Sequence, residues 1–205
     1  MTTRTNAAIA VGLRRPSAGA DPFARGPCYG ADMSMSIEIR RERPGDEAGI
    51  RMVNECAFAQ PNEADLVDAV RTAGAATLSL VAVLEDELVG HILFTPVTVQ
   101  SPKGDFEAVG LAPMAVMPGL QRNGIGSQLV SRGLAELRAA GHEVVVVVGH
   151  AEYYPRFGFV KASGYGIRWE HQVPDEVFMA LELKPGVLRG IGGGVVRFRA
   201  EFAAG

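Results

Sequence analysis

The sequence predicts an α/β protein with a mixed β-sheet, helices on both faces, and the element order β-α-α-β-β-β-α-β-α-β-β. Three observations carry this prediction. A strand ends at Pro118, and apolar residues then recur at helical spacing from about Gly124 to Ala140. Gly141 stops that helix, and the uninterrupted apolar run Val144–Val148 follows at once. A strand, a crossover helix and a strand buried on both faces form a parallel βαβ unit.

Residues 1–36 differ from the rest and are expected to form a disordered tail. They are rich in small residues, and Arg14, Arg15 and Pro16 interrupt the apolar stretch that a signal peptide would need. A start codon placed too early, with Met33 or Met35 as the true beginning, explains the same features. Residues 37–205 are long enough to bury the core of one domain.

The first half of this domain carries signals for one strand and two helices. Ile37–Arg40 alternates apolar and polar residues, as a half-buried strand does. Pro44-Gly45-Asp46 then caps a helix that is expected to run to about Phe58. Pro61 opens a second helix, which Asn62 caps and Gly74 ends.

Three antiparallel strands are expected before the crossover helix, over residues 78–85, 88–99 and 107–117. Short acidic and glycine-containing turns separate them as hairpins. After Val148, the segment GHAEYYPRFGF suggests one short helix followed by a strand. Residues 167–170 and 177–182 are further strand candidates, the glycines at 190, 192, 193 and 194 indicate loops, and 195–198 is expected to be a last edge strand.

Composition limits the function. The net charge is −3, which argues against nucleic acid as a main partner because phosphate backbones bind basic surfaces. Cys28 and Cys56 are far apart and match no metal-binding spacing, so no metal and a reducing, cytoplasmic compartment are expected. No apolar run approaches the roughly 20 residues that span a membrane, so no membrane partner is expected.

Glycine-rich QRNGIG, residues 121–126, is the motif on which the functional interpretation depends. It stands where a helix start exposes unpaired N–H groups and the positive end of the helix dipole, so a phosphate-bearing ligand fits there. A Walker A loop would need Gly-Lys-Ser/Thr after its glycines, which is absent. A dinucleotide fingerprint would need a third Gly or Ala, where Leu129 stands, and would follow the first strand.

The order of elements and Gln121–Gly126 resemble the GNAT superfamily of acyl-CoA-dependent N-acetyltransferases, whose signature is Gln/Arg-x-x-Gly-x-Gly/Ala. AVMP before the motif, VVVVVG after it and YPRFGF further on extend the resemblance over roughly residues 37–183. The segments GHILF, GLAPMAV and GHAEYYPRFGF are also similar to bacterial predicted acetyltransferases labelled YhbS-like. The resemblance implies a GNAT-like fold and acetyl-CoA as co-substrate.

On this resemblance, two backbone segments hold the cofactor. N–H groups from the glycine-rich turn hold the diphosphate, because glycine lacks a side chain that would block its approach. The pantetheine amides pair with the open edge of the fourth strand, at Met114, Ala115 and Val116. The expected cofactor-binding residues are therefore Met114, Ala115, Val116, Gln121, Arg122, Asn123, Gly124, Ile125, Gly126 and Ser127.

Tyr154 stands four residues before Gly158, the position from which relatives protonate the departing CoA thiolate. Tyr153 is the alternative donor, and aromatic packing is the alternative role for both rings. His150, after the last strand of the βαβ unit, is a candidate for substrate contact or proton relay, although a structural hydrogen bond is the commoner role for such a histidine.

The base that deprotonates the acceptor amine is less evident. Some relatives place a glutamate six residues before the strand-end valine, but counting back from Val116 reaches Gly110. Glu63, at the start of the second helix, is the first candidate, with a helix-dipole role as the alternative. Phe58, Asn62 and Trp169 are candidates for the acceptor pocket, with core packing as the alternative for the aromatic residues.

These residues predict direct transfer of acetyl from acetyl-CoA to an amine of a small molecule or protein, with Tyr154 and Glu63 as catalytic groups. The rival is a non-catalytic acyl-CoA-binding or sensing module of the same fold, which the missing strand glutamate keeps open. The exposed last strand would also allow pairing between subunits in a homodimer.

Overall fold

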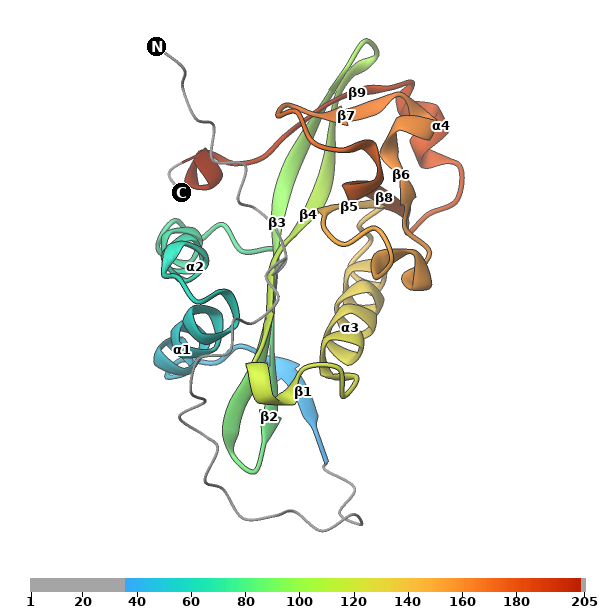
Figure 1. The fold of residues 1–205 in the computed structure, drawn as a ribbon. Coiled ribbons are helices and arrows are strands. Elements are labelled where there is room, and N and C mark those ends of the chain that lie inside the picture. Colours follow the sequence, from blue (N-terminus) through green and yellow to red (C-terminus); the bar gives the residue numbers. More distant parts are fainter. Residues whose placement is uncertain (1–35, 204–205) are drawn as a thin grey trace.

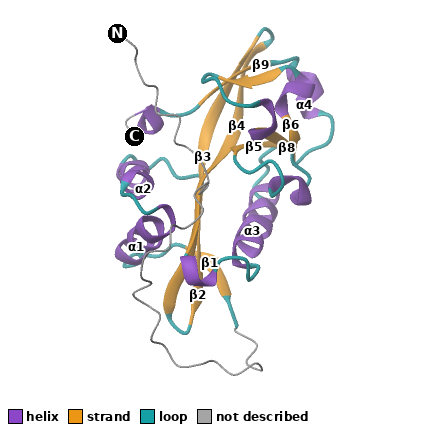
Figure 2. Ribbon diagram, in the orientation of Figure 1, coloured by secondary structure: helices purple, strands orange, loops and turns teal. Residues whose placement is uncertain are grey.

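The computed structural model describes residues 36–203, which form one nine-stranded β-sheet with helices on both faces (Figures 1 and 2). The strands are β1 (Glu38–Arg41), β2 (Leu78–Leu84), β3 (Glu87–Ser101), β4 (Gly104–Val116), β5 (Val144–Val148), β6 (Val160–Lys161), β7 (Ile167–Trp169), β8 (Phe178–Glu182) and β9 (Gly194–Arg197). The helices are α1 (Glu47–Phe58), α2 (Asn62–Thr72), α3 (Ile125–Ala139) and α4 (Val187–Ile191). The tail expected over residues 1–36, with the starts at Met33 and Met35, lies outside the described residues except for Ser36.

The pairing of strands confirms the mixed sheet. β1 to β4 are antiparallel neighbours, β4 and β5 are parallel, and β8 and β6 continue the order antiparallel to their neighbours. Helix α3 connects the parallel pair, as a crossover must. The βαβ unit is therefore present, and the bounds expected for its helix are right to within one residue at each end.

The buried valines of β5 show how the sheet divides the core. Val145 and Val147 pack in the cluster that contains the apolar side of α3. Val144, Val146 and Val148 point the other way and pack with the C-terminal strands. We call the first side of the sheet the α3 face. On the opposite face, α1 and α2 cover β2 to β4, while β7, β9 and α4 cover β5 and β8 (Figure 1).

The C-terminal third differs most from expectation. The short helix expected after β5 is a single 3-10 turn, Tyr154–Phe157, and the strand after it has two residues. Gly190, expected in a loop, lies in α4 instead. The last strand is not an exposed edge, because β9 pairs with β3 on one side and β7 on the other. The edges of the sheet path are β1 and β6 instead.

The start of α2 also corrects a prediction. Asn62 is the first helical residue rather than the cap, and the capping position belongs to Pro61, which has no side chain able to accept a hydrogen bond. The backbone N–H of Asp65 donates to the Pro61 carbonyl at 2.8 Å. A proline is suited to the first turn of a helix, where a missing N–H costs little.

Candidate functional site

β4 and β5 separate at the point where the open strand edge was expected. Their parallel pairing ends at Leu111 and Val147, and a bulge between Leu111 and Met114 interrupts the register of β4 with β3. Beyond the bulge, β3 is the only described strand that pairs with β4. The Met117 N–H donates to the Val89 carbonyl at 2.9 Å, so by strand alternation Met114 and Val116 turn their N–H and C=O groups to the open side.

The start of α3 lies beside this open edge. Gly124 precedes the helix with φ +84°, a left-handed conformation that glycine adopts at no steric cost. The first intrahelical bond runs from the Gln128 N–H to the Gly124 carbonyl at 3.0 Å, which leaves the N–H groups of Ile125, Gly126 and Ser127 without intrahelical partners. The first turn has no acidic residue that would compete for them.

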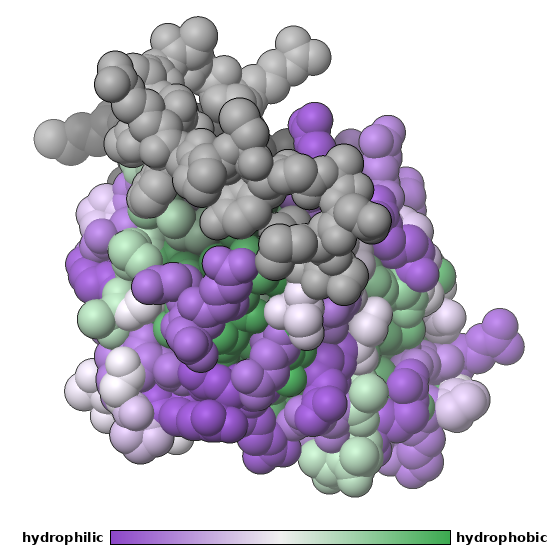
Figure 3. Space-filling model, turned by 90° about the horizontal axis from the view of Figure 1, so that it is seen from below, coloured by the Kyte–Doolittle hydropathy of each residue, from purple (hydrophilic) through white to green (hydrophobic). Residues whose placement is uncertain are grey.

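A side chain at position 126 would fill the space between β4 and the helix. A Cβ there would lie 3.0 Å from the Tyr153 hydroxyl and 3.5 Å from Met114 Cε. The structure therefore brings Met114, Gly126, Ser127 and Tyr153 together. Met114 and Tyr153 are separated by 38 residues of sequence, which include α3 and β5. On the end of the molecule that carries this helix start, hydrophobic residues gather in a strip between hydrophilic ones (Figure 3).

The three polar residues of the motif have different surroundings. Gln121 Nε2 donates to the Val116 carbonyl at 3.0 Å, and Asn123 Nδ2 donates to the Leu120 carbonyl at 3.3 Å, so both side chains hold the turn in shape. Arg122 is exposed, with φ +66°. Its guanidinium forms no ion pair with another residue in 36–203, which leaves it available to a phosphate.

The two tyrosines after β5 differ in how deeply their side chains are buried. Tyr153 is half-buried, its hydroxyl lies 3.5 Å from Ser127 Oγ, and the Arg156 guanidinium stands over its ring at 4.6 Å. Tyr154 is fully buried, its ring lies against Gly149, and its hydroxyl has no hydrogen-bond partner within residues 36–203. Burial raises the pKa of both phenols, and more so for Tyr154.

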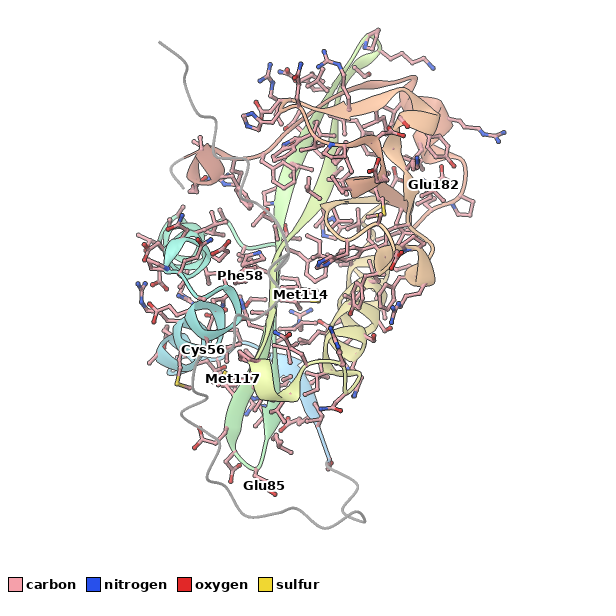
Figure 4. All side chains as sticks on the ribbon, viewed as in Figure 1. Cys56, Phe58, Glu85, Met114, Met117 and Glu182 are labelled. Atoms are coloured by element: carbon pink, nitrogen blue, oxygen red, sulfur yellow. The ribbon has the colours of Figure 1, made fainter. Side chains whose placement is uncertain are left out.

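Glu63 and Phe58 lie on the helices that cover the opposite face. Both carboxylate oxygens of Glu63 accept from Gln60 Nε2 at 3.0 Å, and burial raises the pKa of this carboxyl. Asn62 is exposed, and Phe58 ends α1, which packs against β3 and β4. Figure 4 shows Phe58 on this helix and Met114 on β4.

Trp169 lies further along the sheet than the other predicted site residues. It pairs with Val196 of β9, which pairs with Val99, whereas Met114 pairs with Ile92 near the other end of β3. The indole is buried in the cluster on the opposite face and contacts the Phe198 ring at a centroid distance of 5.9 Å. The structure does not bring Trp169 to the edge formed by Met114–Val116.

A series of buried, hydrogen-bonded polar side chains around His91 was not predicted from the sequence. His91 is fully buried, with Nδ1 3.1 Å from Asn54 Nδ2 and Nε2 3.1 Å from Ser79 Oγ. Ser79 Oγ donates to Glu42, so His91 carries its proton on Nε2 and accepts from Asn54. Burial and the nearby Arg71 lower the pKa of His91 to about 3. His91 pairs with Ala115, and a polar residue inside a strand of apolar ones is the only sequence signal for it.

Other side chains occupy the space into which a side chain at position 110 would extend. A Cβ at position 110 would lie 2.6 Å from Phe198 Cε1 and 2.8 Å from Val97 Cγ1. The glutamate that some relatives carry at this place therefore has no room while Phe198 occupies it. Nothing local in the sequence links these two residues, which come from β4 and the segment after β9.

Two further observations concern metal binding and membrane spans. Among residues 36–203, no three His, Cys, Asp or Glu side chains are grouped so as to hold a metal ion. The helices of this part of the chain are too short or too polar to cross a bilayer.

A parallel βαβ unit with a glycine-opened helix start beside an unpaired strand edge defines a fold and site of the acyltransferase class. The family described as "Acetyltransferase (GNAT) domain" matches residues 38–162. The chain therefore belongs to the GNAT family, as the sequence motifs predicted.

Relatives of known sequence and structure agree. The chain is 38% identical to the uncharacterized N-acetyltransferase YjhQ of Escherichia coli K12, over 71% of this chain and 84% of that protein. A crystal structure of the E. coli GNAT protein YhbS in complex with CoA matches with a TM-score of 0.78 and 33% identity, over 85% of this chain and 96% of that one. A GNAT acetyltransferase from Brucella melitensis in complex with acetyl-CoA matches with a TM-score of 0.68 and 37% identity, over 82% and 99%.

Proposed function

We propose that this GNAT enzyme transfers acetyl directly from acetyl-CoA to an amine. The observation that carries the proposal is the junction of two unpaired backbone segments, the β4 edge at Met114–Val116 and the first turn of α3. An extended arm with amides suits the first, and a diphosphate suits the second. The CoA and acetyl-CoA complexes of the two similar structures support the same donor.

The reaction is a direct acyl transfer between the two bound substrates. The acceptor nitrogen attacks the thioester carbonyl, and the C–S bond breaks to release the CoA thiolate. The N–H of Val116, turned to the open edge, donates to the carbonyl oxygen as negative charge develops there. Holding both substrates in one orientation supplies much of the rate.

Tyr154 is the proposed proton donor to the thiolate. Its hydroxyl proton is donated to no group in the described part of the chain, and burial keeps the phenol protonated by raising its pKa. The same dry surroundings disfavour a bare CoA thiolate, which favours its protonation as the C–S bond breaks. Tyr153, whose hydroxyl lies near Ser127 and Gly126, is the proposed cofactor contact and the alternative donor.

Glu63 is the proposed base for the acceptor ammonium. A carboxyl with a raised pKa takes up a proton more readily near neutral pH than an exposed one. Phe58 and Asn62, five residues and one residue before it, are proposed to line the acceptor side. We propose a cytoplasmic location and leave the homodimer to a direct measurement of mass in solution, since β9 offers no free edge for it.

Calorimetry with CoA followed by a thiol-release assay over a panel of amines tests the proposal. Tyr154→Phe is expected to lower kcat by about 10²–10⁴-fold with CoA affinity unchanged. Tyr153→Phe is the matched control, with the same atom removed from the neighbouring ring, and is expected to weaken CoA binding more than it lowers kcat. CoA binding without thiol release on any amine would support the non-catalytic acyl-CoA sensor instead.

A further inference from the structure

Two consecutive residues of β3, Gly90 and His91, lie directly opposite the open edge of β4. In the β3–β4 register Gly90 pairs with Val116, and His91 pairs with Ala115. The N–H of Val116 is the proposed donor to the thioester carbonyl, and beyond the bulge β3 is the only described strand that holds this part of β4. The direction of that N–H therefore depends on how firmly Gly90 and His91 are held.

Gly90 lies on the α3 face, where the start of α3 packs directly on the strand. A Cβ at position 90 would lie 3.1 Å from Leu129 Cδ1 and 3.3 Å from Ile125 Cγ2. Contacts this short are rare in close-packed interiors, so a methyl group would require the helix or the strand to move by a few tenths of an ångström. Ile125 is the first residue of α3, and its side chain packs in the same cluster as Val116. Gly90 therefore sets the distance between the helix start and the β4 edge.

His91 lies on the opposite face, where both of its ring nitrogens are hydrogen-bonded to neighbouring elements. Nδ1 accepts from Nδ2 of Asn54 on α1, and Nε2 donates to Oγ of Ser79 on β2, both at 3.1 Å. Asn54 Nδ2 also donates to the Ile50 carbonyl at 2.9 Å, so both of its N–H groups are used and the orientation of the amide is fixed. The ring therefore ties β3 to α1 and to β2 at the residue opposite Ala115.

The hydrogen-bonded series around His91 continues to the second helix. Glu42 accepts from Ser79 Oγ and also from Arg71 Nε of α2, the latter at 2.7 Å. Both nitrogens of His91 are paired, and a buried polar side chain with its hydrogen bonds made favours one arrangement of the elements that it joins. This part of β3 is therefore held from both faces, by α3 over Gly90 and by α1 at His91 (Figure 1).

We propose that Gly90 and His91 are positioning residues for the acyl transfer. Gly90 keeps the helix start and the β4 edge at the spacing that a CoA molecule bound to both requires. His91 holds the same part of β3 from the other face, so that the Val116 N–H stays directed at the thioester carbonyl oxygen. Both residues act through groups that contact acetyl-CoA rather than by contacting it themselves. This inference rests on the proposed function and adds two residues to it.

Infrared spectroscopy of bound acetyl-CoA, labelled with ¹³C at the thioester carbonyl, tests the role of His91 without any acceptor amine. A hydrogen bond from the Val116 N–H polarises the carbonyl and lowers its stretching frequency. His91→Leu removes both ring hydrogen bonds at a similar side-chain volume. It is expected to raise that frequency and to lower kcat in the thiol-release assay about tenfold, with CoA affinity unchanged. His91→Gln, which keeps one donor and one acceptor, is expected to restore the wild-type frequency.

Thr95→Val is the matched control, because Thr95 is another buried polar residue of β3 but lies opposite Gly110, where β4 is still paired with β5. It is expected to keep the wild-type frequency and kcat. Asn54→Ala, which removes one of the two bonds to the imidazole, is expected to change both quantities in the same direction as His91→Leu but by less. A lower melting temperature in these two variants with unchanged frequency and kcat would show a purely structural role and overturn the assignment of His91.

Gly90→Ala tests the spacing between the helix start and the β4 edge. Calorimetry is expected to show CoA binding about tenfold more weakly, because one ligand must then fit two segments that have moved apart. Gly133→Ala is the control, since a Cβ there would lie 2.4 Å from Phe94 Cε2, between the same helix and strand. Gly133 lies eight residues after Ile125, or about 12 Å along the helix, so its change is expected to leave CoA affinity intact.

The outcomes separate this inference from the proposed function. Wild-type CoA affinity in Gly90→Ala, or equal losses of affinity in Gly90→Ala and Gly133→Ala, would overturn the assignment of Gly90. A wild-type protein that binds no CoA would overturn the proposed function itself.

Discussion

The two sides of the sheet differ in how far apart, along the sequence, the segments that meet there are. On the α3 side, β4, α3 and β5 follow one another within about 45 residues, and the parts that meet there are neighbours along the chain. On the opposite side, α1 and α2 meet a segment that comes after β9, near the end of the described residues. The comparison teaches that the α3 side is encoded locally, whereas the opposite side depends on contacts between distant segments.

The largest expected effect is on the cofactor side. Valine at both Gly124 and Gly126 is expected to weaken CoA binding about a thousandfold or more, because the side chains block two or three charge-assisted bonds to backbone N–H groups. Calorimetry with CoA measures this. Gly119→Val is the control, since Gly119 has open space around its Cβ position and no left-handed φ. A double variant with intact CoA affinity would contradict the placement of the diphosphate.

This difference between local and long-range contacts explains which elements of the fold could be predicted from the sequence. The spacing of apolar residues defined α3 to within one residue at each end, and the run of valines defined β5, because both signals are periodic and local. The glycines before β9 masked α4, since glycine indicates loops in most contexts. The insertion of β9 between β3 and β7, and the contact of Phe198 with Gly110, depend on tertiary pairing that no local pattern reports.

A second prediction concerns the polar chain around His91, on the α1–α2 side. The folded protein holds this imidazole neutral, with its pKa lowered to about 3, whereas the unfolded chain protonates it near 6.5. Because the unfolded state then binds more protons, stability is full above pH 6.5 and falls as pH drops toward 3. The loss between pH 7 and pH 5 is expected to be about 2 kcal/mol.

Denaturant unfolding of His91→Gln at the two pH values measures this contribution. The variant is expected to lose about 2 kcal/mol less than the wild type between pH 7 and pH 5, whatever its absolute stability. His171→Gln, which changes an exposed histidine, serves as the control and is expected to keep the wild-type difference. Parallel curves for His91→Gln and the wild type would show that burial of the imidazole does not control acid stability.

A third prediction tests the contact between distant segments directly. Gly110→Ala is expected to lower the free energy of unfolding by about 1–3 kcal/mol, because the new methyl group would lie 2.6 Å from Phe198. Phe198→Leu in the same background is expected to recover part of this loss, so the two changes together cost less than their sum. Strict additivity in the double-mutant cycle would mean that Phe198 does not limit position 110.

The smallest expected effect is at the turn between β2 and β3. Its conformation depends on local sequence, but its two residues are of types that disfavour the backbone angles they adopt. Leu84 pairs with Glu87 across a two-residue turn, and both turn residues are left-handed, with φ 48° at Glu85 and 69° at Asp86 (Figure 4). Asn-Gly suits this turn better than Glu-Asp, because glycine and asparagine tolerate positive φ.

Glu85→Asn with Asp86→Gly is therefore expected to raise the free energy of unfolding by about 0.5–1 kcal/mol, measured by denaturant unfolding. Glu87→Asn, one residue outside the turn, should give no such gain, because Glu87 is already in the strand. A local change that stabilises the protein without altering CoA binding would show that hairpin geometry and site geometry are set independently.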